Sequence, residues 1–375
     1  MERSPGCSKL WDFVKKEAVL CIASFCALVS MLFVPPDGAY LDYIDLRVLA
    51  LLFCLMLVVA GLEDCGLFAV LAQRLLAGRR RFRVLCLVLV LLPFFSSMLI
   101  TNDVALITFV PFAILALDLI GRKRELPYVV VLQTVAANLG SMAMPVGNPQ
   151  NLFLCSRFGI PMGEFFALLL PLTAVSLAGL TAAALRSSGE VIQVEFHDRQ
   201  RVGKPGQLWL MIALFALSLL SVFRVLHYGL LLAAVVLSAL AAARHLFRRV
   251  DYALLLTFVC FFIFSGNLGR IPVVREALTG LLSWNTALTA GLASQVISNV
   301  PAAVLLSGFT QDWQGLLLGT DIGGLGTPIA SLASLISLKL YSRSQGAETG
   351  RFMALFFAAN LVGLAVLCLA GWLLT

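Results

Sequence analysis

Long apolar runs alternate with short polar segments along almost the whole chain, and the runs are long enough, or nearly so, to predict membrane-spanning helices. About 20 apolar residues in a helix cross a hydrocarbon core of about 30 Å. The predicted spans are residues 18–34, 46–62, 126–157, 164–185, 207–222, 229–243, 251–265, 313–341 and 352–374. The first run ends in PPDG without a cleavage pattern, so it predicts a retained span and not a signal peptide.

Two further apolar segments, 84–120 and 283–309, carry a polar tip in their middle. The first lies between two basic clusters, which places both of its ends on one side of the membrane. Each segment therefore predicts a re-entrant helical hairpin. For the first, two full spans joined by a very tight turn are the alternative. A short amphipathic helix is expected at 66–77.

Two of the predicted spans are interrupted by glycine, proline and polar residues. The interruptions read NLGSMAMPVGNPQN (138–151) and DIGGLGTPIAS (321–331). When the two segments are aligned with Asn138 opposite Asp321, Gly140 is opposite Gly323 and a proline of each segment is also aligned. A broken helix at membrane depth persists only where it is buried in protein or lines a wet cavity. Matched breaks in two halves are the best sequence-level indication of a transporter's binding site.

The charges of the loops predict how the spans are oriented. Basic residues cluster at Lys9, Lys15 and Lys16, and at 74–83, 122–124, 186–204 and 244–249. The positive-inside rule places these loops and the N-terminus in the cytoplasm. The span 207–222 has no counterpart in either half, so the second half then crosses the membrane in the opposite orientation. The predicted organisation is a first repeat (1–186), a cytoplasmic linker with a connecting span (187–227) and a second, inverted repeat (228–375).

Composition agrees with this pattern. The chain is 60% hydrophobic and 13% charged, with a mean hydropathy of +0.97, which excludes an average soluble domain. We predict an all-α polytopic membrane protein of the plasma (inner) membrane. It has two inverted repeats, each with a re-entrant helical hairpin and a broken transmembrane helix, giving about nine full spans plus two hairpins. The net charge of +7 lies mainly in short loops, so no nucleic-acid partner is expected.

The nine cysteines and three histidines show no metal-binding spacing, so neither a metal nor a cofactor is expected. His197, His227 and His245 fall in loops or at span ends. Glu63 and Asp64 are interpreted as a solvated pair at the end of a span.

A broken helix exposes free N–H groups that suit an oxyanion, and free carbonyl groups that suit a cation such as sodium. Substrate contacts are expected from Asn102, Asn148, Gln150, Asn151, Asn299, Thr327 and Ser331. Contacts to a coupling ion are expected from Thr101, Asn102, Asp103, Asn138, Gly140, Ser298, Asn299, Asp321 and Gly323. The alternative for the amide side chains is that they cap the loosened helix ends.

Asp103 stands out because a carboxylate at membrane depth is costly and is a functional-site hypothesis by default. It is expected to coordinate sodium or carry a proton, and Asp321 is expected to do the same or to cap a half-helix. A catalytic dyad would need the two carboxylates in contact. The repeat register places one in a hairpin tip and the other in a break, so an enzyme is not predicted.

The tips TNDVALITFVP and SNVPAAVLL and the breaks NLGSMAMPVGNPQN and GGLGTPIAS resemble the ion transporter superfamily. That superfamily includes divalent anion–sodium symporters, citrate transporter-like permeases, arsenite efflux permeases and sodium/proton antiporters. The resemblance runs from about residue 15 to the end of the chain. It implies sodium and carboxylate contacts on Thr101, Asn102 and Asp103, and on Ser298, Asn299 and Val300.

The third tip position departs from the Ser-Asn-Thr of the divalent anion symporters, with Asp103 in the first tip and Val300 in the second. The first tip is similar to the arsenite and antiporter branches, whereas GNPQNL is similar to small citrate transporter-like permeases. Together these features predict a secondary active transporter that moves a small anion, coupled to a sodium or proton gradient. The alternative is a sodium/proton antiporter or an arsenite-type oxyanion efflux permease. The expected partners are the small anion, the lipid bilayer and possible second copies in a homodimer.

Overall fold

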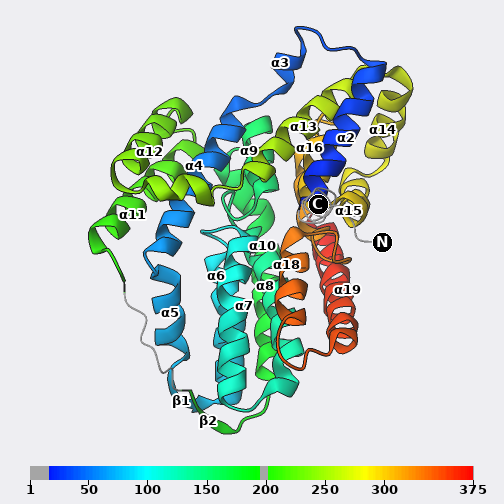
Figure 1. Ribbon diagram of the computed structural model, residues 1–375. Helices are drawn as coiled ribbons and strands as arrows, with labels where there is room; N and C mark the ends of the chain where they lie inside the picture. The colour runs from blue at the N-terminus through cyan, green and yellow to red at the C-terminus, as the bar shows by residue number, and fades with distance from the viewer. Residues whose placement is uncertain (1–16, 195–201, 375) are drawn as a thin grey trace, which may run out of the picture.

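The computed structural model describes residues 17–194 and 202–374, and Figure 1 shows them to be almost entirely helical. Lys9, Lys15, Lys16 and His197 lie outside the described residues. The first half contains α2 (Ala18–Phe33), α3 (Tyr40–Tyr43), α4 (Leu46–Asp64), α5 (Leu67–Leu76), α6 (Phe82–Ser96), α7 (Asn102–Leu119), η1 (Lys123–Glu125), α8 (Leu126–Ser141), α9 (Pro149–Phe158) and α10 (Met162–Leu185).

The connecting helix α11 (Pro205–Val222) leads to the second half. That half contains α12 (Tyr228–Ala242), η2 (Arg244–Arg249), α13 (Tyr252–Gly269), α14 (Pro272–Trp284), α15 (Thr286–Ile297), α16 (Asn299–Leu306), α17 (Trp313–Ile322), α18 (Leu332–Ser342) and α19 (Thr349–Leu374).

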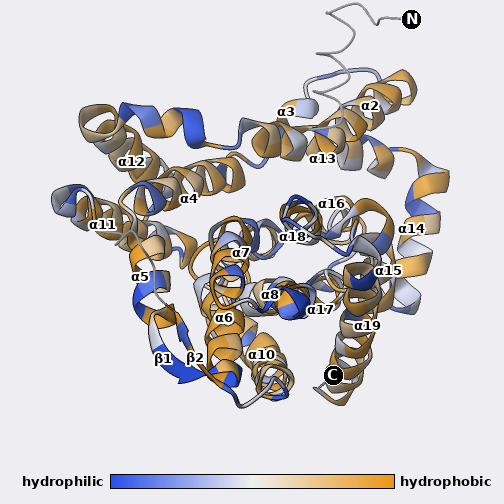
Figure 2. Ribbon diagram, turned by 60° about the horizontal axis from the view of Figure 1, so that its bottom comes forward, coloured by the Kyte–Doolittle hydropathy of each residue, from blue (hydrophilic) through white to orange (hydrophobic). Residues whose placement is uncertain are grey.

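Among the described residues, six helices are long and apolar enough to cross a membrane, namely α4, α7, α10, α11, α13 and α19. Several shorter apolar helices accompany them. Large apolar side chains such as Phe25, Leu237 and Leu361 point outward and are more than 60% exposed. Figure 2 shows hydrophobic residues over most of the helical surface. Such a surface suits lipid and not water. The chain is an integral, multi-pass membrane protein.

The helices form two groups, which Figure 2 separates clearly. In the first, which we call the outer row, α2 packs along α13, and α4 packs against α11 and α12. The second, which we call the broken-helix bundle, contains α6 to α10 and α15 to α19. The amphipathic helices α5 and α14 connect the two groups along the chain. Helix α14 was not predicted, because a short amphipathic segment lacks the continuous apolar run of a span.

The segment 84–120 folds as a helical hairpin of α6 and α7, a form that the predicted re-entrant hairpin and the alternative of two full spans share. Both arms end at the bottom of Figure 1, where the loop after α10 also lies. The Phe82 N–H donates to the Glu190 carbonyl (2.8 Å), and Arg122 forms an ion pair with the Glu190 carboxylate. These contacts place the start of α6 and the end of α7 beside each other. The second hairpin, α15 and α16, turns at Ser298, whose φ of +73° is in the left-handed region.

The expectation of an all-α protein was wrong at one place. Strand β1 (Gly78–Arg81) pairs antiparallel with β2 (Val191–Val194), with Arg79 opposite Gln193. The strands join the basic loop before α6 to the linker after α10. Both segments have only four residues and β1 reads GRRR, so their patterns do not predict strands, and only their proximity in the fold lets their backbones pair.

Candidate functional site

Asn138, near the end of α8, lies at the centre of a buried hydrogen-bond network. Its Oδ1 accepts from Asn102 Nδ2 and from Ser331 Oγ, both at 3.0 Å. Its Nδ2 donates to Ser334 Oγ at 3.3 Å. One side chain therefore ties the first hairpin tip and the first break to the start of α18 beyond the second break.

Each hairpin tip docks onto a break through the same kind of contact. The Asn102 N–H donates to the Gly147 carbonyl (3.2 Å), and the Asn299 N–H donates to the Ala330 carbonyl (3.0 Å). With Asn138 placed over Asp321, Gly147 and Ala330 occupy corresponding positions. Each tip asparagine also accepts from the N–H of the residue that follows it. The two tips are thus held in equivalent ways.

Four helix N-termini begin around this network. Helices α7 and α16 start at the tips, whereas α9 and α18 start at the ends of the breaks. The Asn148 side chain caps α9 by accepting from the Asn151 N–H (2.9 Å). An α-helix carries partial positive charge at its N-terminus. The convergence of four such ends makes the region favourable for an anion, although no lysine or arginine among the described residues hydrogen-bonds to the network.

Asp321, in the last turn of α17, is held by residues of the first break. Its Oδ1 accepts from Asn148 Nδ2 (3.1 Å) and Gln150 Nε2 (3.4 Å). The carboxylate is 4% exposed. Asn148 therefore does more than cap a helix, because its side chain also joins the first break to the second. Both Asn148 and Gln150 had been predicted as substrate contacts.

A cavity of about 660 Å³ lies between the outer row and the broken-helix bundle, next to the network. Asn102, Asn138, Ser331 and Ser334 do not line it, but residues adjacent in the sequence to Asn102, Ser331 and Ser334 do. The residues that line it include Thr101, Asp103, Val146, Asn148 and Leu332 near the network. Glu63, Arg249 and Lys339 line it as well. The Asp103 carboxylate makes no hydrogen bond or ion pair with any described residue. It is therefore free to meet an ion or a substrate in the cavity. It also has no contact with Asp321, so the described residues contain no aspartyl dyad.

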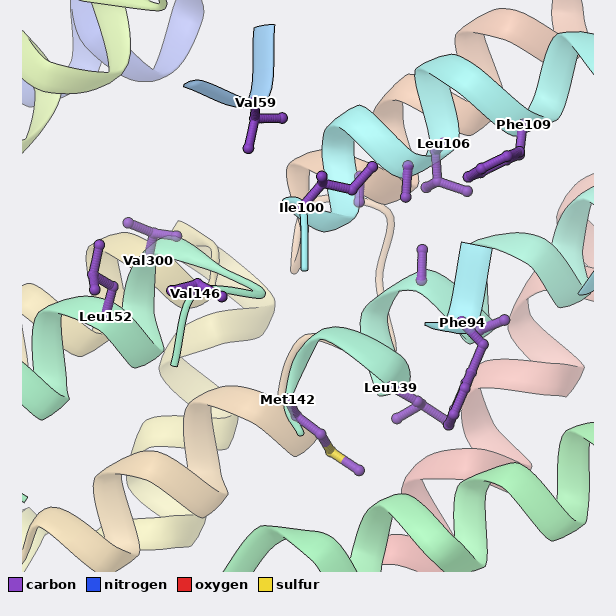
Figure 3. Close-up of a cluster of buried hydrophobic side chains, with 14 of the residues drawn as sticks. Val59, Phe94, Ile100, Leu106, Phe109, Leu139, Met142, Val146, Leu152 and Val300 are labelled. Atoms are coloured by element: carbon purple, nitrogen blue, oxygen red, sulfur yellow. The ribbon is translucent and has the colours of Figure 1, made fainter. Parts of the chain in front are cut away.

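The second tip presents a different surface from the first. Val300 corresponds to Asp103 in the tips, but it is only 8% exposed. Figure 3 shows it beside Val146 and Leu152 of the first broken segment. Its apolar side chain cannot ligate an ion. Only the first tip therefore offers a charged side chain to the cavity.

Gly140 and Gly323, expected to contact the coupling ion, lie where the hairpins press on the broken helices. A side chain at Gly140 would overlap the Phe94 carbonyl of α6, and one at Gly323 would come within 3.0 Å of Ser294 Cβ in α15. The absence of a side chain permits this close approach in both halves.

Replacing Gly140 by alanine should lower the free energy of unfolding by about 1–3 kcal/mol, because the added methyl group meets backbone that cannot move aside cheaply. The melting temperature of the purified protein measures the effect. Gly179→Ala in α10 is the matched control, since nothing lies within 4 Å of its added methyl group. That control should be neutral or stabilising by up to about 1 kcal/mol. Equal melting temperatures for both variants would contradict the packing role.

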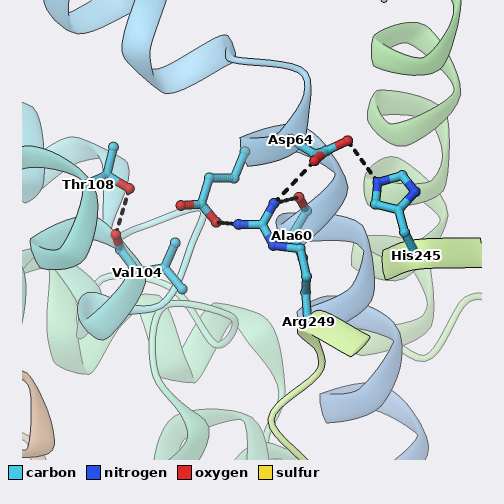
Figure 4. Close-up of polar contacts among 7 residues, drawn as sticks. Ala60, Asp64, Val104, Thr108, His245 and Arg249 are labelled. Carbon is cyan, nitrogen blue, oxygen red and sulfur yellow. Dashed lines mark hydrogen bonds and ion pairs between the residues drawn. The ribbon is translucent and has the colours of Figure 1, made fainter. Parts of the chain in front are cut away.

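The ion pairs at the cavity mouth were not expected. Glu63 and Asp64 had been interpreted as a solvated pair, but each side chain is only 30% exposed and both bind Arg249. Arg249 Nη2 lies 2.7 Å from Glu63 Oε2. His245 Nε2 lies 2.9 Å from Asp64 Oδ2, and Figure 4 shows Asp64 between His245 and Arg249. Both residues do lie at the end of α4, and Asp64 as a whole residue is exposed, but η2 brings the basic cluster at 244–249 against them.

Sequence analysis missed Gln295, which holds the second break. Its Nε2 donates to the carbonyls of Gly323 (2.8 Å) and Leu325 (2.9 Å), and its Oε1 accepts from the Thr327 N–H (2.9 Å). The Thr327 hydroxyl, predicted to bind substrate, donates to the Gln295 carbonyl (3.0 Å). The available signal was an amide in an apolar hairpin arm, four residues before Asn299.

Other buried polar residues that support the site were also missed. Thr134 Oγ1 donates to Ser337 Oγ at 2.7 Å, which joins α8 to α18 below Asn138. Asn360 of α19 accepts from the Gly326 N–H at 3.3 Å. Each lies in a largely apolar helix, where a hydroxyl or amide gives no sign of its partner. Only the packing of distant helices reveals these contacts.

Two helical hairpins docked on two broken helices beside a cavity define a membrane transporter and not an enzyme. Comparison with known proteins agrees. Residues 10–312 match the family described as citrate transporter, and the chain belongs to this family.

The chain is similar to an uncharacterized transporter of Methanocaldococcus jannaschii, with 32% identity covering 84% of this chain and 86% of that one. It is 33% identical to the inner membrane protein YbiR of Escherichia coli, covering 79% and 80% of the two chains. A silicon efflux transporter of Oryza sativa is 35% identical over 38% of this chain and 28% of its own.

Proposed function

We propose that the protein is a secondary active transporter that moves a small oxyanion across the plasma membrane, coupled to a sodium or proton gradient. One observation carries the proposal: the N-termini of α7 and α18 meet at Asn138, those of α9 and α16 lie at the same two breaks, and the Asp103 carboxylate, unpaired among the described residues, lines the cavity beside them. The helix ends suit the negative charge of the substrate. The carboxylate suits the coupling cation.

We also propose that the two halves are inverted repeats. The order of elements supports this, because each half has two helices, an amphipathic helix, a hairpin, a broken helix and a final long helix. The equivalent docking of Asn102 on Gly147 and of Asn299 on Ala330 supports it as well. The connecting helix α11 reverses the orientation of the second half.

Transport would follow from movement of the broken-helix bundle against the outer row. The network around Asn138 lies inside the bundle, whereas the cavity lies between the two groups. The bundle would carry its bound substrate as a unit, and α5 and α14 would connect it to the outer row during the movement. The cavity mouth contains Arg249 and Lys339, in agreement with the cytoplasmic side predicted from loop charges.

Efflux of a small oxyacid is a second candidate, and proton or sodium antiport would drive it. The observation that favours it is the lack of a basic side chain in the network, because a neutral hydroxylated solute needs amides and hydroxyls but no counter-charge. The name of the rice relative, a silicon efflux transporter, points in the same direction.

A melting-temperature screen of the purified protein tests the proposed function. Carboxylates, sulfate, arsenite and silicic acid are added one at a time, with and without sodium or lithium. A ligand at about 100 times its dissociation constant should stabilise the folded state by about 2.7 kcal/mol. We expect one class of oxyanion to raise the melting temperature, with a larger rise in sodium or at lower pH. Failure of every anion under all these conditions would exclude the proposed function, and a shift by silicic acid alone would favour the second candidate.

A further inference from the structure

Asp321 and two amide residues beside it each carry a buried oxygen atom that has no hydrogen-bond partner among the described residues. The three atoms are Asp321 Oδ2, Gln150 Oε1 and Asn151 Oδ1. The three residues are at most 4% exposed, and the Asn148, Gln150 and Asn151 side chains all lie beside the Asp321 carboxylate. Buried polar atoms are nearly always paired, so a group of three unpaired acceptors needs an explanation.

The donors of these residues are already engaged. Gln150 Nε2 donates to Asp321 Oδ1 (3.4 Å), and Asn151 Nδ2 donates to the Met142 carbonyl (3.4 Å). Exchanging the nitrogen and oxygen of either amide would set oxygen against oxygen at these contacts. The three unpaired atoms therefore remain acceptors, and their natural complement is a cation.

The charge of the group leads to the same conclusion. No lysine, arginine or histidine among the described residues pairs with Asp321, so its carboxylate has no counter-charge. A buried charge without a partner is strongly unfavourable. One carboxylate oxygen with two amide oxygens provides hard, oxygen-only ligands with a single negative charge. This combination suits a monovalent hard cation and gives little reason to bind a divalent one.

We propose that Asp321, Gln150 and Asn151 form a sodium site between the two helix breaks. That sodium bound here takes part in coupling rests on the proposed function. Gln150 and Asn151, which were predicted to contact the substrate, contact the ion in this proposal. The site is separate from the hairpin tips, since none of its three ligands belongs to a tip. Asn148 contacts Asp321 and also lines the cavity, so the ion enters past this side chain. Sodium bound there ties α9 to α17 and stabilises the arrangement of both breaks.

The test measures melting temperature and ²²Na⁺ binding of the full-length purified protein without any anion, in sodium chloride or in N-methylglucamine chloride. The Asp103→Asn variant is the starting protein, so that the cavity carboxylate does not contribute. Sodium should raise its melting temperature. Adding Asp321→Asn should weaken sodium binding by about tenfold or more, because the charged ligand is lost.

Without sodium, the Asp321→Asn variant should melt at or above the temperature of its parent, because its new NH₂ group can donate to the unpaired amide oxygens. This expectation separates loss of the ion site from loss of folding. Gln150→Met should also weaken sodium binding. Asp118→Asn, which changes an exposed carboxylate paired with Lys123, should leave it unchanged.

A sodium response that Asp321→Asn leaves intact would overturn the proposed site. So would a parent protein that responds only to pH, since Asp321 would then carry a proton. The outcome is independent of the proposed function. If an anion stabilises the protein but sodium does not, the sodium site is excluded and the proposed transport function stands. If sodium stabilises the protein but no anion does, the proposed transport function is excluded and the sodium site stands.

Discussion

Replacing Asn138 by leucine is expected to abolish transport and to destabilise the protein. The change leaves the Asn102 amide and the Ser331 and Ser334 hydroxyls without their shared partner. Each buried polar group left unpaired costs about 1–3 kcal/mol. The first tip would also lose its link to the start of α18, and a displacement of about 1 Å in a functional site is enough for a roughly 100-fold loss of rate. Uptake into proteoliposomes and the melting temperature measure the two effects.

Thr173→Val in α10 is the control for the loss of a buried polar group. The Thr173 hydroxyl is buried but bonds only to the Leu169 carbonyl one turn earlier in its own helix. We expect this variant to transport at nearly the normal rate and to lose less than about 1 kcal/mol of stability. If Asn138→Leu behaves like Thr173→Val, the network around Asn138 does not organise the site.

Replacing Asp103 by asparagine is expected to uncouple transport. The carboxylate faces the cavity without a partner, and the substitution keeps its shape while removing the charge that attracts the coupling cation. Accumulation of substrate against its gradient should fall to simple equilibration. Exchange of internal for external substrate should stay within about threefold, a change that corresponds to less than about 1 kcal/mol of barrier. Both are measured in the same proteoliposomes, with an imposed sodium or proton gradient.

Asp118→Asn provides the matched control, because it makes the same substitution on the same helix. Asp118 lies near the end of α7, about half exposed, and pairs with Lys123 at 2.7 Å. Gradient-driven accumulation should be unchanged. The role assigned to Asp103 would be wrong if its variant accumulated substrate normally, or if exchange and accumulation fell together.

Most elements of the fold were predictable because a membrane helix depends mainly on the residues within its own segment. A span needs an unbroken apolar run, and a break needs glycine and proline within that run. The segments 138–151 and 321–331 satisfied both conditions, and the structure places the interruptions at 142–148 and 323–331. The amphipathic helix at 66–77 was also predicted, and α5 (Leu67–Leu76) confirms it. The polar tips likewise indicated the turns of the hairpins.

The partners of the polar residues were not predictable in the same way. Gln295, Ser334 and Asn360 lie in largely apolar helices, and nothing nearby in the sequence distinguishes a structural amide or hydroxyl from a functional one. Thr327 was predicted as a substrate contact from its place in a break, and the structure adds a partner that the local sequence does not indicate: both its N–H and its hydroxyl are bound to Gln295. Hydrogen-bond partners separated by 30 or more residues depend on helix packing, which leaves no local pattern.

The sequence by itself determined that the chain is a helical membrane protein with two broken segments and two hairpins, because apolar run length and helix-breaking residues act locally. Only the tertiary structure decided which polar groups meet. It placed Asp103 in the cavity and Val300 against an apolar wall, although the two hold the same position in their tips. It also brought Asp321 of the second break to the amides of the first. The reason is that burial and pairing arise where distant helices cross, and a side chain's surroundings there come from residues far away in the sequence.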